Sequence, residues 1–201
     1  MQLPFVYYPG AGHDFGVLTH FAQHHGTSTF VFTDYNPEAA RPSAIVDALG
    51  AWKVTAQEKI TPASFDASHW KDFWFDHPNA HDFNSPREAF GTRFTLTRGP
   101  EENITLYYLC TDGIGTLQLT INKMGIPDVV VLQDHGMGGN WDRFGGHSLL
   151  FETACANGDR PPFIFLAENT EIWPGYHSPS AEDFRGEFGS ASNKRALCPL
   201  Q

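Results

Sequence analysis

The sequence has few cysteines, few basic residues and no long hydrophobic run. Its three cysteines are an odd number, and a chain of 201 residues can bury a sizeable core without disulfides, so we expect reduced thiols and a cytoplasmic location. The 13 lysines and arginines stand against 23 aspartates and glutamates, a net charge of −10, which disfavours nucleic acid and anionic membranes as partners. The longest apolar runs, such as Val129–Leu132, are far too short to span a membrane, and the first residues do not form a signal-peptide pattern.

Hydrophobic residues make up 41% of the chain and include 17 phenylalanines, which is typical of a globular domain with its own core. Short apolar runs alternate along the chain with stretches whose apolar residues recur at helical spacing. Runs that are apolar throughout are typical of strands buried on both faces, so we predict an α/β fold with a mainly parallel sheet flanked by helices. The predicted strands are 5–8, 29–33, 94–97, 104–109, 129–132 and 163–167, and the predicted helices are 14–25, 42–54, 115–123 and 148–156.

The stretch 61–93 interrupts this alternation. It holds six aromatic residues and three histidines between Phe65 and Phe83, with scattered proline and asparagine and no stable period. We interpret it as an aromatic-rich insertion or lid-like loop within a single domain that covers residues 1–201. The last stretch, 177–201, is rich in glycine, serine and proline and is expected to be an irregular tail.

A glycine loop follows the first predicted strand. Gly10 and Gly12 allow a sharp turn and the close approach of a ligand to the backbone, and Asp14 opens the next predicted helix. Asp34 lies 22 residues beyond Gly12, near the offset at which an acid meets a ribose hydroxyl. Asp14 argues against a dinucleotide, because a pyrophosphate would need that helix N-terminus. The pattern predicts a ligand with a ribose and a cationic group; the alternative is a tight turn with Asp14 as a helix N-cap.

A second polar cluster follows the apolar run Val129–Leu132. Gln133, Asp134 and His135 precede a glycine-rich stretch, so an acid, a base and exposed backbone N–H groups would stand together at a strand end. His135 could serve as a general base near neutral pH, and Asp134 could accept a substrate proton or bind an amine. A glycine-rich turn in which the aspartate caps the next helix is the alternative.

Two hydrolase interpretations compete with this one. Gly146-His147-Ser148 resembles part of a nucleophile elbow, but Leu150 stands where the elbow needs glycine. His69, His77 and His81 lie among aspartates and could hold a divalent ion, although no HExxH or CxxC spacing occurs in the chain. We therefore expect no metal, and a metal-assisted hydrolase remains the third hypothesis.

The order of these elements resembles the class I S-adenosylmethionine-dependent methyltransferase-like superfamily, which has a Rossmann-like fold. In that comparison Gly10-Ala11-Gly12 takes the place of the family's glycine loop, Asp34 that of its ribose-binding acid, and Asp112 falls where the family often contacts adenine. The chain departs from the family at Tyr7-Tyr8, where an acid is usual, and in having only 34 residues after Ala167. The resemblance implies S-adenosylmethionine as the cofactor, held by Gly10, Gly12, Asp14, Asp34, Asp112 and Gln133, with Asp134 and His135 as catalytic residues.

The sequence thus predicts a protein that binds a nucleoside-type small molecule, with methyl transfer as the activity that the resemblance implies. A binding or interaction protein that keeps the sheet without the chemistry is the main alternative, favoured by the departures from the family pattern.

Overall fold

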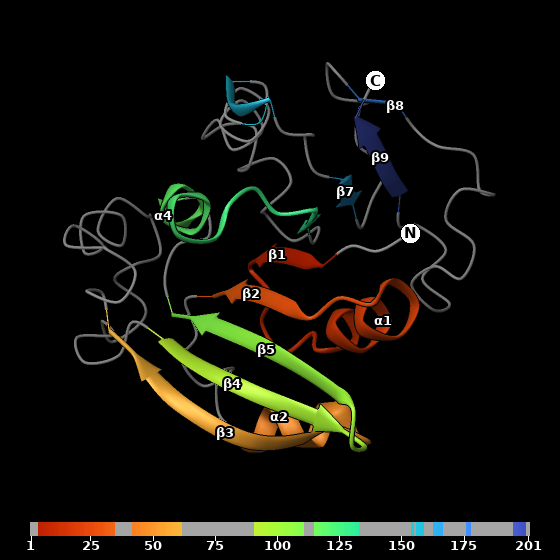
Figure 1. The fold of residues 1–201 in the computed structure, drawn as a ribbon, viewed down its shortest axis with the longest axis vertical. Helices are drawn as coiled ribbons and strands as arrows, with labels where there is room; N and C mark the ends of the chain where they lie inside the picture. The colour runs from red at the N-terminus through yellow and green to blue at the C-terminus, as the bar shows by residue number, and fades with distance from the viewer. Residues whose placement is uncertain are drawn as a thin grey trace.

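The fold was obtained as a computed structural model, which describes residues 4–34, 42–61, 91–110, 115–132, 154, 156–158, 163–166, 176–177 and 195–199. One large sheet runs through the molecule, with helices packed on it (Figure 1). The helices are α1 (Gly16–His25), α2 (Pro42–Leu49) and α4 (Gly115–Met124). The strands are β1 (Phe5–Pro9), β2 (Thr29–Thr33), β3 (Lys53–Ile60), β4 (Gly91–Arg98), β5 (Glu102–Leu109), β6 (Val129–Leu132), β7 (Phe163–Leu166), β8 (Tyr176–His177) and β9 (Arg195–Pro199).

The sheet is mixed rather than mainly parallel. Its strand order is β3-β4-β5-β2-β1-β6-β7-β9-β8. The central strands β5, β2, β1, β6 and β7 pair in parallel, whereas β3 with β4, β4 with β5, β7 with β9 and β8 with β9 pair antiparallel. The described chain is also richer in strand than in helix. The prediction of a Rossmann-like, mainly parallel sheet flanked by helices is therefore wrong, because antiparallel strands extend both sides of the parallel centre.

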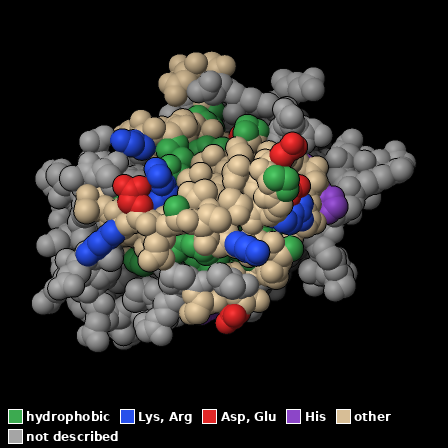
Figure 2. All heavy atoms as spheres, turned by 60° about the horizontal axis from the view of Figure 1, so that its bottom comes forward, with side chains coloured by type: hydrophobic (Ala, Val, Ile, Leu, Met, Phe, Trp, Pro, Cys, Tyr) green, Lys and Arg blue, Asp and Glu red, His purple; other side chains and the backbone are tan. Residues whose placement is uncertain are grey.

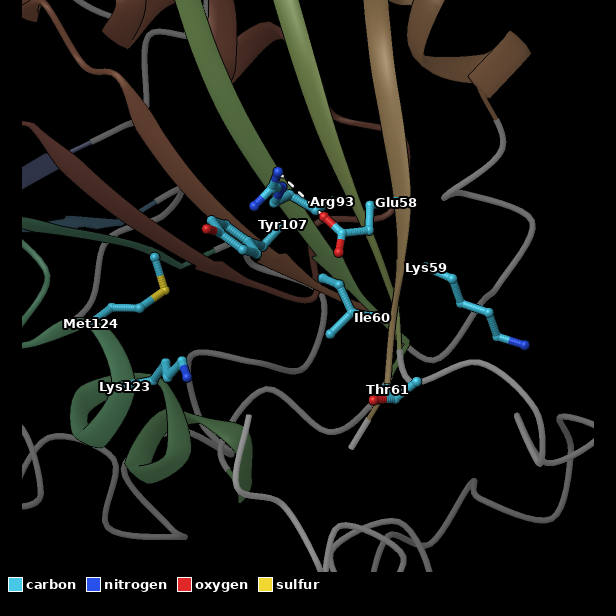
Figure 3. Close-up of a pocket in the computed structure, with 8 residues that line it drawn as sticks. All are labelled: Glu58, Lys59, Ile60, Thr61, Arg93, Tyr107, Lys123 and Met124. Atoms are coloured by element: carbon cyan, nitrogen blue, oxygen red, sulfur yellow. Dashed lines mark ion pairs between the residues drawn. The ribbon is translucent and has the colours of Figure 1, made fainter. Parts of the chain in front are cut away.

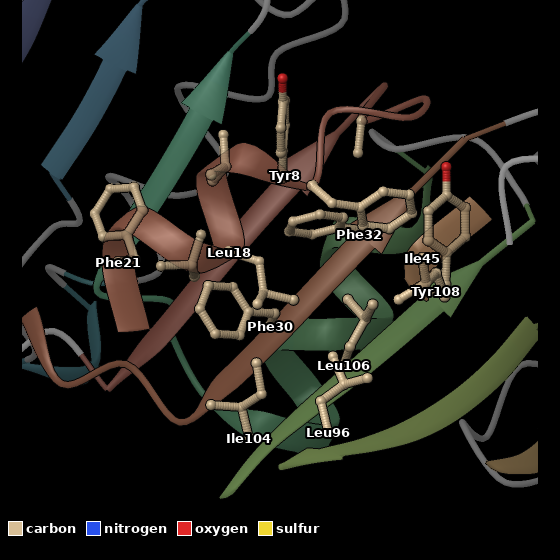
Figure 4. Close-up of a cluster of buried hydrophobic side chains, with 14 of the residues drawn as sticks. Tyr8, Leu18, Phe21, Phe30, Phe32, Ile45, Leu96, Ile104, Leu106 and Tyr108 are labelled. Atoms are coloured by element: carbon tan, nitrogen blue, oxygen red, sulfur yellow. The ribbon is translucent and has the colours of Figure 1, made fainter. Parts of the chain in front are cut away.

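The core lies on both faces of the central strands, because successive strand side chains point to opposite faces. On one face, Tyr8 of β1 and Phe32 of β2 pack against α1 and α2 (Figure 4). On the other face, the Tyr7 hydroxyl is hydrogen bonded to Thr116 Oγ1 of α4 at 3.2 Å. Tyr7, Tyr8 and Phe32 are fully buried, which explains why their strands carry no polar alternation.

The main local error of the sequence prediction lies between α2 and β3. The predicted helix 42–54 ends at Leu49, Gly50 has a positive φ of 55°, and β3 begins at Lys53. Residues 55–59 of β3 are exposed, since β3 is the outermost strand of its side of the sheet. Figure 2 shows side chains of both charge signs interspersed over this region. Such charges are typical of an edge strand, where they disfavour pairing with another chain.

The two segments expected to be irregular are placed by the strands beside them. Ile60 pairs with Gly91, so residues 61–90 connect two neighbouring antiparallel strands. The predicted insertion, apart from Thr61 and 91–93, lies outside the described residues. The predicted tail contains β9, which pairs antiparallel with β7, so that part of the expectation is wrong. Within the described ranges no helix is long and apolar enough to cross a membrane.

Candidate functional site

The loop after β1 lies directly against the residue that follows β2. The backbone N–H of Gly12 donates to Asp34 Oδ2 at 2.8 Å, although 22 residues separate the two in the chain. The parallel register of β1 and β2 accounts for this contact, because Pro9 pairs with Thr33 and the two strands end at the same level. Gly12 has a φ of 51°, a left-handed conformation that favours glycine. The two residues predicted to share a site are thus neighbours.

Two tyrosine hydroxyls hold the same loop from beneath. Tyr108 of β5 donates to the carbonyl oxygen of Gly12 at 2.7 Å, so both backbone polar groups of Gly12 are bound by side chains from other strands. Tyr8 donates to Asp14 Oδ2 at 2.9 Å. Asp14 is not the N-cap of α1, which is Phe15 and has no side-chain capping bond. The loop is therefore held by β1, β2 and β5 together.

Asp34 contributes to raising the pKa of two neighbouring side chains, Cys110 and Tyr108. Burial, followed by the charge of Asp34, raises the pKa of the Cys110 thiol to about 12. Burial, Asp34 and Cys110, in that order of importance, raise the pKa of Tyr108 above its usual value. Both groups are therefore protonated at neutral pH, and Tyr108 remains a hydrogen-bond donor to the loop. Neutral hydrogen-bond donors therefore lie beside Asp34 at this edge of the sheet.

A buried hydroxyl next to Asp34 lacks a partner among the described residues. Thr33 is fully buried, and its Oγ1 makes no hydrogen bond within those residues. Buried hydroxyls are usually satisfied by protein, water or ligand, since an unsatisfied one costs about 1–3 kcal/mol. Thr33 precedes Asp34 at the end of β2, so this is an edge of the sheet where a polar group would be accommodated.

The remaining predicted site residues fall outside the described ranges. Asp112 follows β5, and Gln133, Asp134 and His135 follow β6, but none of the four is described. The same holds for His69, His77, His81 and Ser148 of the hydrolase hypotheses. In the part of the chain that is described, no group of three or more His, Cys, Asp or Glu side chains could hold a metal ion. The roles of all these residues stay predictions.

Sequence reasoning missed several residues that the fold brings to this edge or near it. Tyr108 and Cys110 lie at the end of β5, and their aromatic and apolar surroundings in the sequence are those of an ordinary buried strand. The one feature of the sequence that could have identified them as site residues is their position, because each stands within two residues of the end of an apolar run. Sequence reasoning also missed a pocket of about 390 Å³ formed by β3, β4, β5 and α4 (Figure 3).

Comparison with known proteins yields no match to a protein-family model, a curated protein or a solved structure. The function is therefore argued from the site's geometry.

Proposed function

We propose that this protein binds a nucleoside-type small molecule over the carboxyl ends of β1 and β2, with Asp34 accepting hydrogen bonds from the ribose. The observation that carries the proposal is the 2.8 Å contact between Gly12 N and Asp34 Oδ2, which places a carboxylate beside a glycine loop at the end of parallel strands. A carboxylate has about four acceptor positions, and the Gly12 N–H uses one of those of Asp34.

The strand order supports the same location. From β1 the chain forms β2 beside it and then β3 at the far edge, and β4 and β5 lead back to β2. The chain then crosses to the other side of β1 to form β6 and β7. In sheets with parallel strands, ligands bind outside the carboxyl ends where the order reverses in this way. The loop 10–14 lies at the end of β1, the strand at which the order reverses. A ligand there would contact the loop that Asp34 and Tyr108 hold in place.

S-adenosylmethionine is the specific cofactor that the family resemblance suggests. Asp34 lies beside the glycine loop, where its carboxylate would accept hydrogen bonds from the ribose hydroxyls. Among the described residues, the nearest atom to a Cβ added on Gly12 would be Asp34 Oδ2 at 3.8 Å, which leaves room for a ligand beside the backbone on that side. When bound, this cofactor would supply an activated methyl group. Asp134 and His135 are the residues we propose to act on a substrate, in a cytoplasmic enzyme.

A binding protein without catalytic activity is the second candidate, and one observation favours it. The rings of Tyr8, Phe15, Phe32 and Tyr108 pack together beneath the loop, with the Tyr8 and Phe32 centroids 5.2 Å apart. Such a layer would hold the loop rigid whether or not any chemistry takes place above it. The Tyr8–Asp14 bond also occupies an acceptor of Asp14, one of the loop residues that the methyltransferase-like interpretation assigns to the cofactor.

Calorimetric titration of the full chain tests the proposal. Adenosine, S-adenosylmethionine and its demethylated product should each give saturable binding, and Asp34→Asn should weaken it about tenfold, because Asn loses charge-assisted acceptance but keeps an oxygen for Gly12. Asp47→Asn, an exposed site on α2 with the same charge change, is the matched control and should leave binding unchanged.

The ribose assignment has its own control. 2′,3′-Dideoxyadenosine lacks the hydroxyls that Asp34 would bind, so wild type and Asp34→Asn should bind it equally. No binding of any nucleoside at millimolar concentration would overturn the proposal. Equal adenosine affinities in wild type and Asp34→Asn would remove Asp34 from the site.

A further inference from the structure

A pocket away from the glycine loop is lined, among the described residues, by more basic than acidic side chains. The pocket of about 390 Å³ on β3, β4, β5 and α4 falls within the usual range of small-molecule sites. Among the described residues, Lys59, Arg93 and Lys123 line it together with one acid, Glu58, in a chain whose net charge is −10. A local excess of positive charge on an acidic protein favours an anionic ligand.

The pocket lies on the sheet face opposite to the aromatic cluster below the glycine loop. Tyr107 alternates with Leu106 and Tyr108, which belong to that cluster, so its ring is directed to the other face. Arg93 pairs with Tyr107 across the β4–β5 ladder and therefore shares its face. Lys123 and Met124 approach from the last turn of α4. The pocket is thus separate from the site of Asp34.

The three basic side chains differ in their orientation relative to the pocket. Figure 3 shows Lys123 on α4, on the same side of the pocket as Met124, whereas Lys59 points away from the other lining side chains. Arg93 Nη2 is paired with Glu58 Oε2 at 3.3 Å, and the two side chains are 46% and 67% exposed. An ion pair so exposed is weak, and one carboxylate does not use all five N–H donors of the guanidinium. A ligand anion could therefore bind Arg93 beside Glu58 or displace it.

The other side chains that line the pocket are suited to contact a flat, apolar ring of a ligand. Ile60 is only 5% exposed and gives an aliphatic base, and Tyr107 presents an aromatic ring. The thioether of Met124 is an adaptable group that makes favourable contacts with rings. Aromatic and aliphatic walls with a few placed cations are the usual composition of a site for an amphipathic small molecule.

We propose that this pocket binds a small aromatic anion of the carboxylate type, with its ring between Tyr107, Ile60 and Met124 and its charged group on Arg93 and Lys123. Glu58 opposes binding by competing for Arg93. The site is independent of the nucleoside site, so Asp34→Asn should leave it unaffected.

The test uses two probes of nearly equal shape, 2-naphthoate and the neutral 2-naphthylmethanol, titrated into the full chain by NMR. Naphthoate should bind saturably, and Arg93→Gln and Lys123→Gln should each weaken it about tenfold. Lys53→Gln changes the net charge equally but lies on β3 outside the pocket, and it should have no effect. Glu58→Gln should instead tighten binding, whereas Glu101→Gln, an exposed acid outside the pocket, should not.

Three results would overturn the proposal. They are the absence of saturable naphthoate binding, an equal affinity for the neutral alcohol, or a loss with Lys53→Gln as large as with Lys123→Gln. Thermal melting of the Arg93→Gln and Lys123→Gln variants shows whether a loss of naphthoate binding reflects the pocket or a loss of folding. The two residues lie on different elements, so one local defect in folding would not affect both.

Discussion

The contact between Asp34 and Gly12 should be measurable as stability without any ligand. Asp34→Ala removes the acceptor of the Gly12 N–H and leaves that donor at a half-buried position. Hydrogen bonds to a charged group contribute about 1.5–3 kcal/mol, and partial exposure of both residues puts this one near the lower end. We therefore expect Asp34→Ala to lower the free energy of unfolding by about 1.5–2 kcal/mol, and Asp34→Asn by about half as much.

Urea denaturation monitored by tryptophan fluorescence measures this difference. With a urea m-value of about 2–3 kcal/mol/M, the midpoint of Asp34→Ala should fall by about 0.7 M. Asp47→Ala, an exposed change on α2, is the control and should stay within about 0.5 kcal/mol of wild type. A midpoint for Asp34→Ala indistinguishable from wild type would refute the reasoning that this bond holds the loop.

A second test of the loop uses Tyr108, whose hydroxyl binds the carbonyl oxygen of Gly12. Tyr108→Phe keeps the buried ring but removes the donor to the Gly12 carbonyl, a loss of about 1 kcal/mol. Because Asp34 and Tyr108 bind the two backbone groups of one residue, their effects should be coupled by about 0.5 kcal/mol or more in a double-mutant cycle. Strict additivity would show that the two bonds do not hold one conformation in common.

Three further predictions follow from buried positions. Gly91→Ala places a methyl group against the backbone carbonyl of Tyr108, which cannot move aside, so we expect a loss of about 3 kcal/mol or more and a melting temperature lower by about 6–12 °C in calorimetry. Cys110 keeps its proton to about pH 12 when folded but loses it near pH 8.5 when unfolded, so stability should fall as pH rises above 9, by at most about 1.4 kcal/mol per pH unit; urea titrations at pH 8 and 10 should show a smaller fall for Cys110→Ala than for wild type. Partial burial raises the pKa of Asp128, whose Oδ2 accepts from Phe5 N at 2.9 Å. Asp128→Asn keeps that acceptor without a charge at this half-buried position, so it should be at least as stable as wild type at pH 7 in urea denaturation, with an advantage that disappears below about pH 4 as the aspartate becomes protonated. A lower stability of Asp128→Asn at pH 7 would contradict this.

The central strands could be predicted because burial on both faces leaves a strong signal in the sequence. The predicted strands 29–33 and 129–132 coincide with β2 and β6, and the predicted strand 5–8 lacks only the last residue of β1. Apart from the threonines at the two ends of β2, these segments have no polar side chain that alternates with the apolar ones, and this pattern predicts burial on both faces. The parallel centre of the sheet is accordingly where sequence and structure agree.

The edges could not be predicted by the same means. β3 is exposed over most of its length and reads KVTAQEKI, a polar sequence that gives no period from which its pairing could be inferred. The antiparallel pairing of β4 with both β3 and β5 depends on contacts across the sheet, and this is why the sheet was wrongly predicted to be mainly parallel. Propensity and periodicity describe a strand's faces, not its neighbours.

The candidate site divides in the same way. Gly12 and Asp34 could be placed together from their spacing, because two consecutive parallel strands bring their ends to one edge. The Tyr108 bond to Gly12 joins residues 96 apart and depends on the pairing of β2 with β5, which the sequence does not state. The pocket lined by Arg93 and Lys123 forms only when the fold brings β4 and α4 together. In the sequence its residues are scattered charges with no common pattern.

The central claim is that a nucleoside-type ligand binds at the glycine loop, and amide NMR of the ¹⁵N-labelled protein tests it most directly. On titration with S-adenosylhomocysteine, the Gly10 and Gly12 amide signals should shift saturably, while those of Arg93 and Lys123 stay in place. The account is contradicted if Gly12 does not move at any ligand concentration, or if the shifts appear at Arg93 and Lys123 instead.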